Sequence, residues 1–132
     1  MANKRVAIIA SSGGLETAYK VLNIATAAAA LDAEVGIFFT FEGLSIIRKN
    51  SEQMLKLKPK NAGWEEGLKK ANVPAIGQLL EIAKESGVRM IACQMTVDVM
   101  GLDKKDFIEG VEFGGAAAFL DFAFDSQVTL NF

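Results

Sequence analysis

The stretch that decides the fold lies near the amino terminus and reads Lys4-Arg5-Val6-Ala7-Ile8-Ile9-Ala10-Ser11-Ser12-Gly13-Gly14. Its short, nearly continuous apolar run, closed by serines and glycines, is typical of a central parallel strand that is buried on both faces. A long apolar helix is predicted next, from Leu15 to Leu31, and then a second strand from Ala33 to Thr40. Strand, helix and strand in this order begin a right-handed crossover unit, so the sequence predicts an α/β fold.

The chain beyond this unit adds elements of the same kinds. Residues 41–44 turn into a short helical piece, and a clear helix is predicted from Pro74 to Ser86, with Pro74 in its first turn and Gly87 just past its end. The other predicted elements are a strand at Arg89–Cys93, a short helix capped by Asp103, a very short strand at Val111–Glu112, a helix at Ala116–Phe124 and a last strand at Ser126–Phe132. We therefore expect a three-layer α/β/α sandwich of Rossmann-like type, with four to five mostly parallel strands, in a single domain over residues 1–132.

Residues 48–63 interrupt this pattern. Lysines and arginines alternate loosely with apolar residues there, and Pro59, Asn61 and Gly63 break any regular element. An irregular stretch of this length is uncommon inside a compact domain. Two interpretations stay open, a solvated excursion and a lid or partner-docking segment that carries Trp64 at its end.

The composition excludes several classes of function. Apolar residues make up 51% of the chain and charged residues 23%, as in globular proteins. The formal net charge is −2 and no basic face is apparent, so we expect no nucleic-acid partner. One cysteine and no histidine leave little to hold zinc or copper, and no carboxylate cluster indicates another metal, so we predict neither metal nor cofactor.

The amino-terminal residues predict the compartment. Residues 1–6 enter a strand at once and lack the apolar core and cleavage site of a signal peptide. No apolar run reaches the roughly 18 residues that a transmembrane helix needs. We expect a cytoplasmic, reduced protein without a transmembrane segment.

The only cysteine, Cys93, lies at a junction that favours reactivity. It ends a predicted strand and directly precedes the helical spacing that starts at Gln94. Backbone N–H groups and the helix dipole at such a junction favour thiolate over thiol. The alternative interpretation is a small buried hydrophobe, which is the commoner role of a lone cysteine.

The absence of histidine limits what a reactive Cys93 can do. Hydrolysis by a cysteine–histidine pair is excluded, because no base of that kind exists in the chain. Attack of a thiolate on another sulfur atom needs no such base, since the leaving sulfur does not have to be protonated. Sulfur transfer or redox chemistry therefore fits Cys93 better than acyl transfer.

Loops that follow three strands are expected to form one site, because ligands of open parallel sheets bind outside the carboxyl ends of the strands. The predicted pocket residues besides Cys93 are Ser11, Ser12, Gly13, Gly14, Phe41, Gly43 and Gln94. The Ser-Ser-Gly-Gly turn resembles an anion cradle but lacks the Walker and dinucleotide-binding patterns. It is open to three interpretations: a plain strand-to-helix turn, the floor for a small anionic or sulfur-bearing substrate, and a nucleotide site.

Three segments resemble one known family. They are Ala92-Cys93-Gln94-Met95-Thr96-Val97-Asp98-Val99-Met100-Gly101, the turn at 11–14 and Val111-Glu112-Phe113-Gly114-Gly115-Ala116. Together they are similar to the DsrE/DsrF/DsrH-like sulfur-relay family, in particular to its single-domain, DsrE-like branch that carries a peroxiredoxin label. The resemblance implies a three-layer α/β/α fold, homo-oligomers, and a cysteine, here Cys93, that carries sulfur as a persulfide.

Two functions follow from these observations. The leading hypothesis, implied by the resemblance, is a sulfur carrier or sulfurtransferase-like protein that takes sulfane sulfur on Cys93 and passes it to a thiol of a partner, such as a rhodanese-like or TusA-like protein. Peroxide reduction would need an external thiol, because the chain has no resolving cysteine. The alternative is a small-anion or nucleotide-binding or assembly module in which Cys93 is inert and buried.

Overall fold

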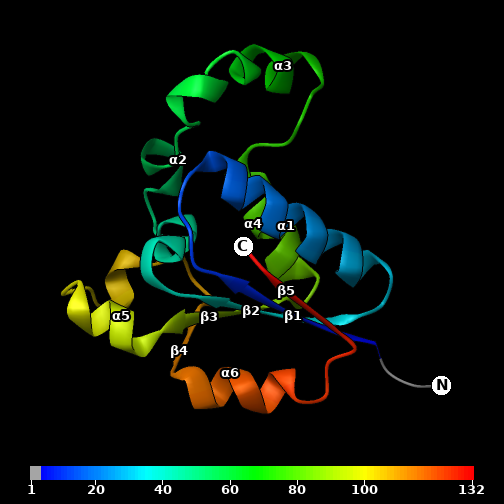
Figure 1. The fold of residues 1–132 in the computed structure, drawn as a ribbon, viewed down its shortest axis with the longest axis vertical. Helices are drawn as coiled ribbons and strands as arrows, with labels where there is room; N and C mark the ends of the chain where they lie inside the picture. The colour runs from blue at the N-terminus through cyan, green and yellow to red at the C-terminus, as the bar shows by residue number, and fades with distance from the viewer. Residues whose placement is uncertain (1–3) are drawn as a thin grey trace.

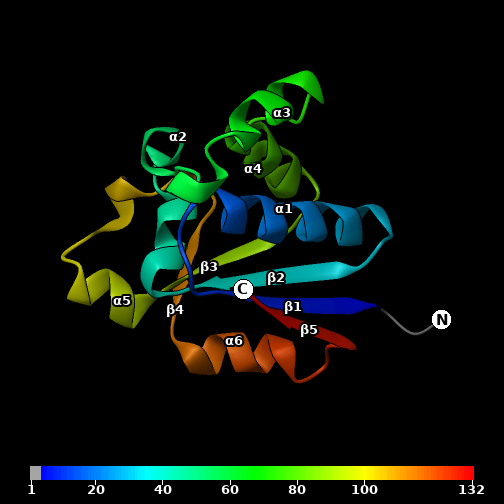
Figure 2. The same cartoon turned by 45° about the horizontal axis from the view of Figure 1, so that its top comes forward.

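Five strands form the middle layer of the computed structural model, which describes residues 4–132 (Figure 1). They are β1 Arg5–Ala10, β2 Glu34–Phe39, β3 Arg89–Cys93, β4 Glu112–Gly114 and β5 Val128–Asn131. Their order across the sheet is β4-β3-β2-β1-β5, and each neighbouring pair is parallel. Helices lie on both sides of this sheet (Figure 2), so the prediction of a three-layer α/β/α fold is confirmed.

The two helical layers bury different sets of side chains. Helices α1 (Leu15–Ala30) and α4 (Ile76–Glu85) cover one face of the sheet, and α6 (Ala116–Ala123) covers the other (Figure 2). The larger core lies under α1 and α4, because alternate strand residues such as Ile8, Ile37 and Met90 point there. The smaller core lies under α6 and contains Ala7, Phe38, Ile91, Cys93, Phe119 and Phe122.

Several boundaries differ from the prediction. Pro74 lies outside α4, because the helix begins at Ile76 and the Gln78 side chain caps it by accepting a hydrogen bond from the N–H of Ala75 at 3.0 Å. The very short strand begins at Glu112, opposite Ile91 of β3. The placement of Pro74 in the first turn was therefore wrong, and the short strand lies one residue later and runs to Gly114.

The remaining short elements connect the sheet to its loops. They are η1 Phe41–Ile47, α5 Gln94–Val99 and η3 Lys104–Asp106, which Asp103 caps as predicted. Residues 1–3, part of the stretch in which the sequence predicts no signal peptide, lie outside the described residues. Among residues 4–132, no helix has both the length and the apolar character to cross a membrane.

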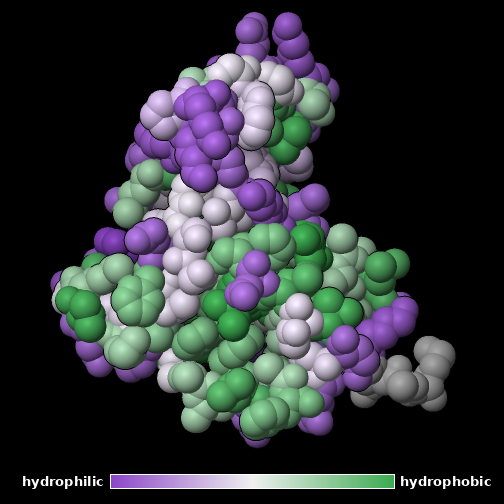
Figure 3. All heavy atoms as spheres, viewed as in Figure 1, coloured by the Kyte–Doolittle hydropathy of each residue, from purple (hydrophilic) through white to green (hydrophobic). Residues whose placement is uncertain are grey.

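An arm extends beyond the α1 layer (Figure 1). It consists of three short elements, α2 Ser51–Met54, η2 Pro59–Asn61 and α3 Trp64–Lys70. The first two lie within the irregular segment 48–63, and α3, which has no buried residue, is not predicted by the sequence. Figure 3 shows this upper part as largely hydrophilic or neutral, whereas apolar residues gather over the lower half of the same face.

Glu16 of α1 fastens the arm to the body. Its Oε2 atom accepts hydrogen bonds from the Lys58 N–H at 2.7 Å and from the Asn61 side chain at 2.8 Å. These two bonds, that of Asn61 first, lower the pKa of the Glu16 carboxyl below its usual value. Glu16, in the first turn of α1, is thus an anchor for the segment after Met54.

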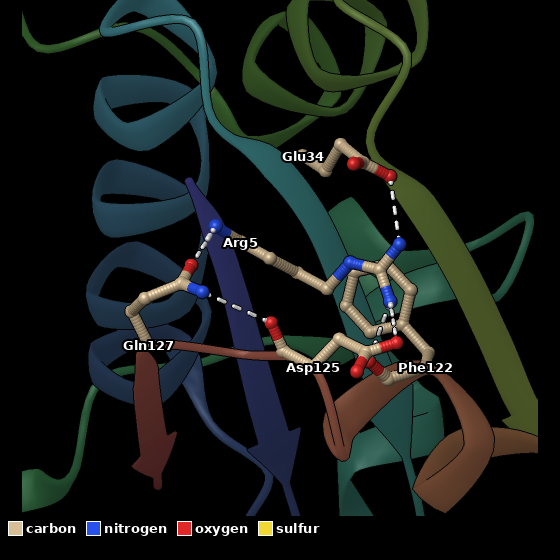
Figure 4. A network of polar contacts seen from close by, with 5 residues as sticks. All are labelled: Arg5, Glu34, Phe122, Asp125 and Gln127. Carbon is tan, nitrogen blue, oxygen red and sulfur yellow. Dashed lines mark hydrogen bonds and ion pairs between the residues drawn. The ribbon is translucent and has the colours of Figure 1, made fainter. Parts of the chain in front are cut away.

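Arg5 joins four parts of the structure at the opposite end of the sheet (Figure 4). Its guanidinium donates to the Phe122 carbonyl at 2.9 Å and to the Glu34 carboxylate at 3.1 Å, and it lies 4.5 Å from the centre of the Phe122 ring. The backbone N–H of Arg5 donates to the Gln127 side chain at 2.7 Å, and the Asp125 carboxylate lies 3.7 Å from the Arg5 guanidinium. β1, β2, the end of α6 and the entry to β5 are tied together by this one side chain.

Candidate functional site

Three loops meet at the carboxyl edge of the sheet, because β1, β2 and β3 are neighbours. Gly43 makes the close approach possible, since a Cβ atom there would lie 1.9 Å from the Ala10 carbonyl oxygen. Ser11 donates its N–H and its hydroxyl to the Phe132 carbonyl, at 2.8 and 3.1 Å. Ser11 and Gly43 therefore hold the loops together, and a ligand would meet other residues.

Cys93 is the last residue of β3 and the N-cap of α5. Its side chain points to the α6 side of the sheet, into the smaller core with Phe38 and Phe119, and the residue is 4% exposed. The predicted strand-to-helix junction is thus present with the predicted bounds. The thiol is held in place on a β-strand and covered by packing.

The pKa of the Cys93 thiol reflects two opposing influences. Burial alone would raise the pKa of the Cys93 thiol, but the hydroxyls of Thr96 and Thr40 and the N–H groups of Thr96 and Met95 stabilise the thiolate. Together they outweigh burial and place the pKa of Cys93 below its ordinary value. Hydrogen bonding, rather than a charged neighbour, is therefore what lowers the pKa of Cys93.

Thr96 is the centre of this shell and is 1% exposed. Its Oγ1 atom accepts a hydrogen bond from the Phe41 N–H at 3.2 Å and lies 3.3 Å from the Thr40 hydroxyl. Phe41 reaches it in a left-handed backbone conformation, φ 49°, which is uncommon for an aromatic residue. Since the Thr96 oxygen accepts from Phe41, its own proton is free to point at the sulfur or at Thr40.

A cleft of about 780 Å³ opens beside this shell. Of the predicted pocket residues, Ser12, Gly13, Gly14 and Phe41 line the cleft. Cys93 and Gln94 are not among its lining residues, and the Gln94 side chain instead donates to Asp98 at 2.9 Å. The structure therefore brings four of the predicted pocket residues into one cavity, and the Cys93 thiol does not line that cavity.

Several residues at this edge have no counterpart in the sequence-based site. The cleft is also lined by Lys20, Arg48 and Lys58, which come from α1, the end of η1 and the arm. No motif connects these cations in the sequence. The role of Thr96 could have been predicted from the sequence. Thr96 stands three residues after Cys93, which is the spacing at which a residue of the first helical turn reaches back to the N-cap.

The arrangement can generate a nucleophile but offers no general base. Among the titratable side chains, none is a cause of the lowered pKa of Cys93, which comes from hydroxyls and backbone N–H groups. In the part of the chain from residue 4 to 132, no three His, Cys, Asp or Glu side chains gather to hold a metal ion. The arrangement suits attack by the Cys93 thiolate on a sulfur atom, a reaction that needs no general base.

Comparisons with known proteins agree on sequence and fold. Residues 2–64 and 60–131 match the DsrE/DsrF/DrsH-like family. The sulfur carrier protein DsrE2 of Allochromatium vinosum is 36% identical over an alignment of 159 residues, which covers 98% of this chain and 99% of the relative. The protein YrkE of Bacillus subtilis is 34% identical, with 96% of each chain covered.

Solved structures share the architecture. YchN of E. coli superposes with a TM-score of 0.72 at 18% identity, and MTH1491 of Methanobacterium thermoautotrophicum with a TM-score of 0.63 at 19% identity. In both cases 98% of this chain and 99% of the other are covered. These structures support the fold alone. From the sequence matches, which span nearly its whole length, the chain belongs to the DsrE/DsrF/DrsH-like family.

Proposed function

We propose that the protein is a sulfur carrier that accepts sulfane sulfur on Cys93 as a persulfide and passes it to a thiol of a partner protein. The observation that carries the proposal is the donor shell of Cys93, which lowers the pKa of a thiol in a chain without histidine. The name of the DsrE2 relative, a sulfur carrier protein, supports the same chemistry. Rhodanese-like and TusA-like proteins are the partners that the family resemblance implies.

The transfer is a displacement at sulfur. The Cys93 thiolate attacks the sulfane sulfur of a donor, a new bond forms between Sγ and that sulfur, and the donor's own bond to it breaks, so the electron pair leaves with the donor group. In the second step a partner thiolate attacks the outer sulfur, and Cys93 leaves as a thiolate. The donors from Thr40, Thr96 and Met95 stabilise the anion that exists before the first step and after the second.

The burial of Cys93 sets a structural condition on both steps. Cys93 is 4% exposed, so its neighbours cover most of the residue. The neighbouring Met95 is 56% exposed and Phe41 is 53% exposed, so the first turn of α5 and the loop after β2 face solvent. Transfer therefore requires a neighbouring segment to move aside, and these two or α6 are the segments placed to do so.

Intact-mass spectrometry tests the proposal. The protein is incubated with polysulfide, or with thiosulfate and a rhodanese, and a gain of one sulfur atom is expected in the wild type and is expected to be absent in Cys93→Ser. Circular dichroism of the variant controls for folding. If no donor loads the wild type, the carrier function is refuted, and a ligand bound at Ser12–Gly14 beside an unreactive thiol would then favour a binding or assembly module.

Assembly and location complete the proposal. We place the protein in the cytoplasm, where a lone thiol stays reduced, as a homo-oligomer. Apolar side chains on and after α6 support self-association, since Leu120, Phe124 and Val128 are 46%, 79% and 45% exposed. Light scattering of the purified protein measures its mass in solution, and a monomer at all concentrations would contradict the oligomer.

A further inference from the structure

The cleft beside Cys93 is cationic in a protein whose formal net charge is −2. Lys20, Arg48 and Lys58 line it, and Glu42 is the one acidic side chain among the lining residues. Across residues 4–132, the ion pairs present leave all three of these cations without a carboxylate partner. Three elements thus bring positive charge to one cavity, and the carboxylates of Glu42 in its lining and of Glu16 near Lys58 offset only part of it.

Arg48 gives the strongest indication of a missing ligand. Its Nε atom is buried, and within the described part of the chain no hydrogen-bond acceptor reaches it. Buried donors are nearly always paired, because an unpaired one loses its hydration without compensation. A guanidinium that lines a cavity and has a free buried donor is suited to a carboxylate or another oxyanion.

Size and wall chemistry narrow the class of ligand. A cavity of about 780 Å³ has the volume of an organic ligand site and greatly exceeds a small inorganic ion. Leu44, Met54 and Phe132 give it apolar walls. The cations suit the carboxylates of an amino-acid-derived molecule, and Glu42 suits its ammonium group.

Phe41 and Thr96 connect the cleft indirectly to the thiol. Phe41 lines the cleft, and its N–H donates to Thr96, the residue that stabilises the Cys93 thiolate. Because Cys93 does not line the cleft and its side chain points to the α6 side of the sheet, a ligand bound in the cleft reaches the sulfur only when the loop after β2 moves aside.

We propose that this cleft binds a low-molecular-weight organic persulfide through its carboxylates and presents the sulfane sulfur to Cys93. The proposal rests on the carrier function above and names its donor. The thiolate Cys93–S⁻ attacks the outer sulfur of R–S–S–H, the Cys93–S–S–H bond forms, the S–S bond of the donor breaks, and R–S⁻ leaves with the electron pair. Atoms and charge balance, and no outside oxidant or reductant takes part.

The first test measures binding without transfer. Glutathione, a peptide thiol with two carboxylates and one ammonium group, is titrated calorimetrically into the Cys93→Ser protein. Loss of one charge-assisted contact is expected to weaken binding about tenfold in Arg48→Gln and about tenfold in Lys58→Gln. Lys49→Gln, an exposed neighbour outside the cleft, is the matched control and should bind as before.

The second test measures transfer to the wild-type thiol. Glutathione persulfide should load Cys93 faster than its diester, in which both carboxylates are esterified and carry no charge. The double variant Arg48→Gln, Lys58→Gln should lose this preference. Equal loading by the two donors in the wild type overturns the inference, as does thiosulfate binding without glutathione binding. Lys58 is exposed, so its single variant keeps the test valid if Arg48→Gln does not fold.

The binding test and the transfer test together separate this inference from the carrier function. If glutathione binds with the expected dependence on Arg48 but no donor loads Cys93, the carrier function fails and the cleft assignment stands. If polysulfide loads Cys93 while glutathione binds the wild type and Arg48→Gln equally, the cleft assignment fails and the carrier function stands.

Discussion

Replacing Thr96 by Val is the sharpest test of the donor shell around Cys93. Valine has nearly the same shape, so packing changes little, but the hydroxyl that helps to lower the pKa of Cys93 is lost. The Phe41 N–H, which donates to Thr96 Oγ1 at 3.2 Å, also loses its acceptor. A buried donor left unpaired costs about 2 kcal/mol, which corresponds to a fall of roughly 8 °C in Tm for a domain of this size.

The effect on the thiol has a defined direction. Because the shell lowers the pKa of Cys93 in the folded protein, the thiolate contributes stability at pH values above the ordinary thiol pKa of about 8.5 and loses that contribution as pH falls through the folded pKa. Thr96→Val should therefore raise the pKa of Cys93. Its deficit in stability should also be larger above about pH 8.5 than near pH 6.

Two measurements follow the pKa of Cys93 and the stability of the folded protein. Ultraviolet absorbance of the thiolate against pH reports on Cys93, the one cysteine of the chain, at pH values below the ionisation of Tyr19, whose pKa is raised, and it does not require a reagent to reach a buried atom. Thermal denaturation at two pH values gives the stability. Thr129→Val, at an exposed position on β5, is the matched control. A titration midpoint unchanged by Thr96→Val would refute the assigned role of the threonine.

Three further perturbations test other contacts. Gly43→Ala should destabilise the fold by about 3 kcal/mol, because the added Cβ atom would lie 1.9 Å from the Ala10 carbonyl oxygen. Gly63→Ala, in open space, should be tolerated, and urea denaturation compares the stabilities of the two variants. Glu16→Gln should be less stable than wild type at neutral pH, and the gap should close in acid, because a carboxyl with a lowered pKa loses its contribution as pH falls through that pKa. Glu112→Gln should cost less than about 1 kcal/mol, and less in high salt, because the Arg89–Glu112 pair is half exposed.

Sequence patterns predict the parts of this structure that local chemistry determines. The strand Arg89–Cys93 was predicted with the observed bounds, because an apolar run ends there and helical spacing begins. α3 was missed because it buries no residue, so its sequence shows no apolar face. The prediction places the start of α4 at Pro74, two residues too early, because Gln78, a residue inside the helix, determines where the cap forms.

The site was predictable in part for the same reason. Ser12, Gly13, Gly14 and Phe41 follow strands that are neighbours in the sheet, so parallel topology alone brings them to one edge. The cations of the cleft come from separate parts of the chain, and Lys58 joins Lys20 and Arg48 there because Glu16 binds its backbone at the start of α1. Their meeting depends on tertiary contacts such as those of Glu16, which have no periodic signature.

The burial of Cys93 gives the proposed carrier a way to signal its state. A persulfide adds one atom to a side chain that already packs with Phe38 and Phe119. Protein interiors are close-packed, so the extra sulfur cannot be absorbed without displacing a neighbour. The neighbours that can yield are α6 and the first turn of α5, both of which reach the surface. A loaded protein would then differ in outline from an empty one, and a partner could recognise which molecules carry cargo before any bond is exchanged.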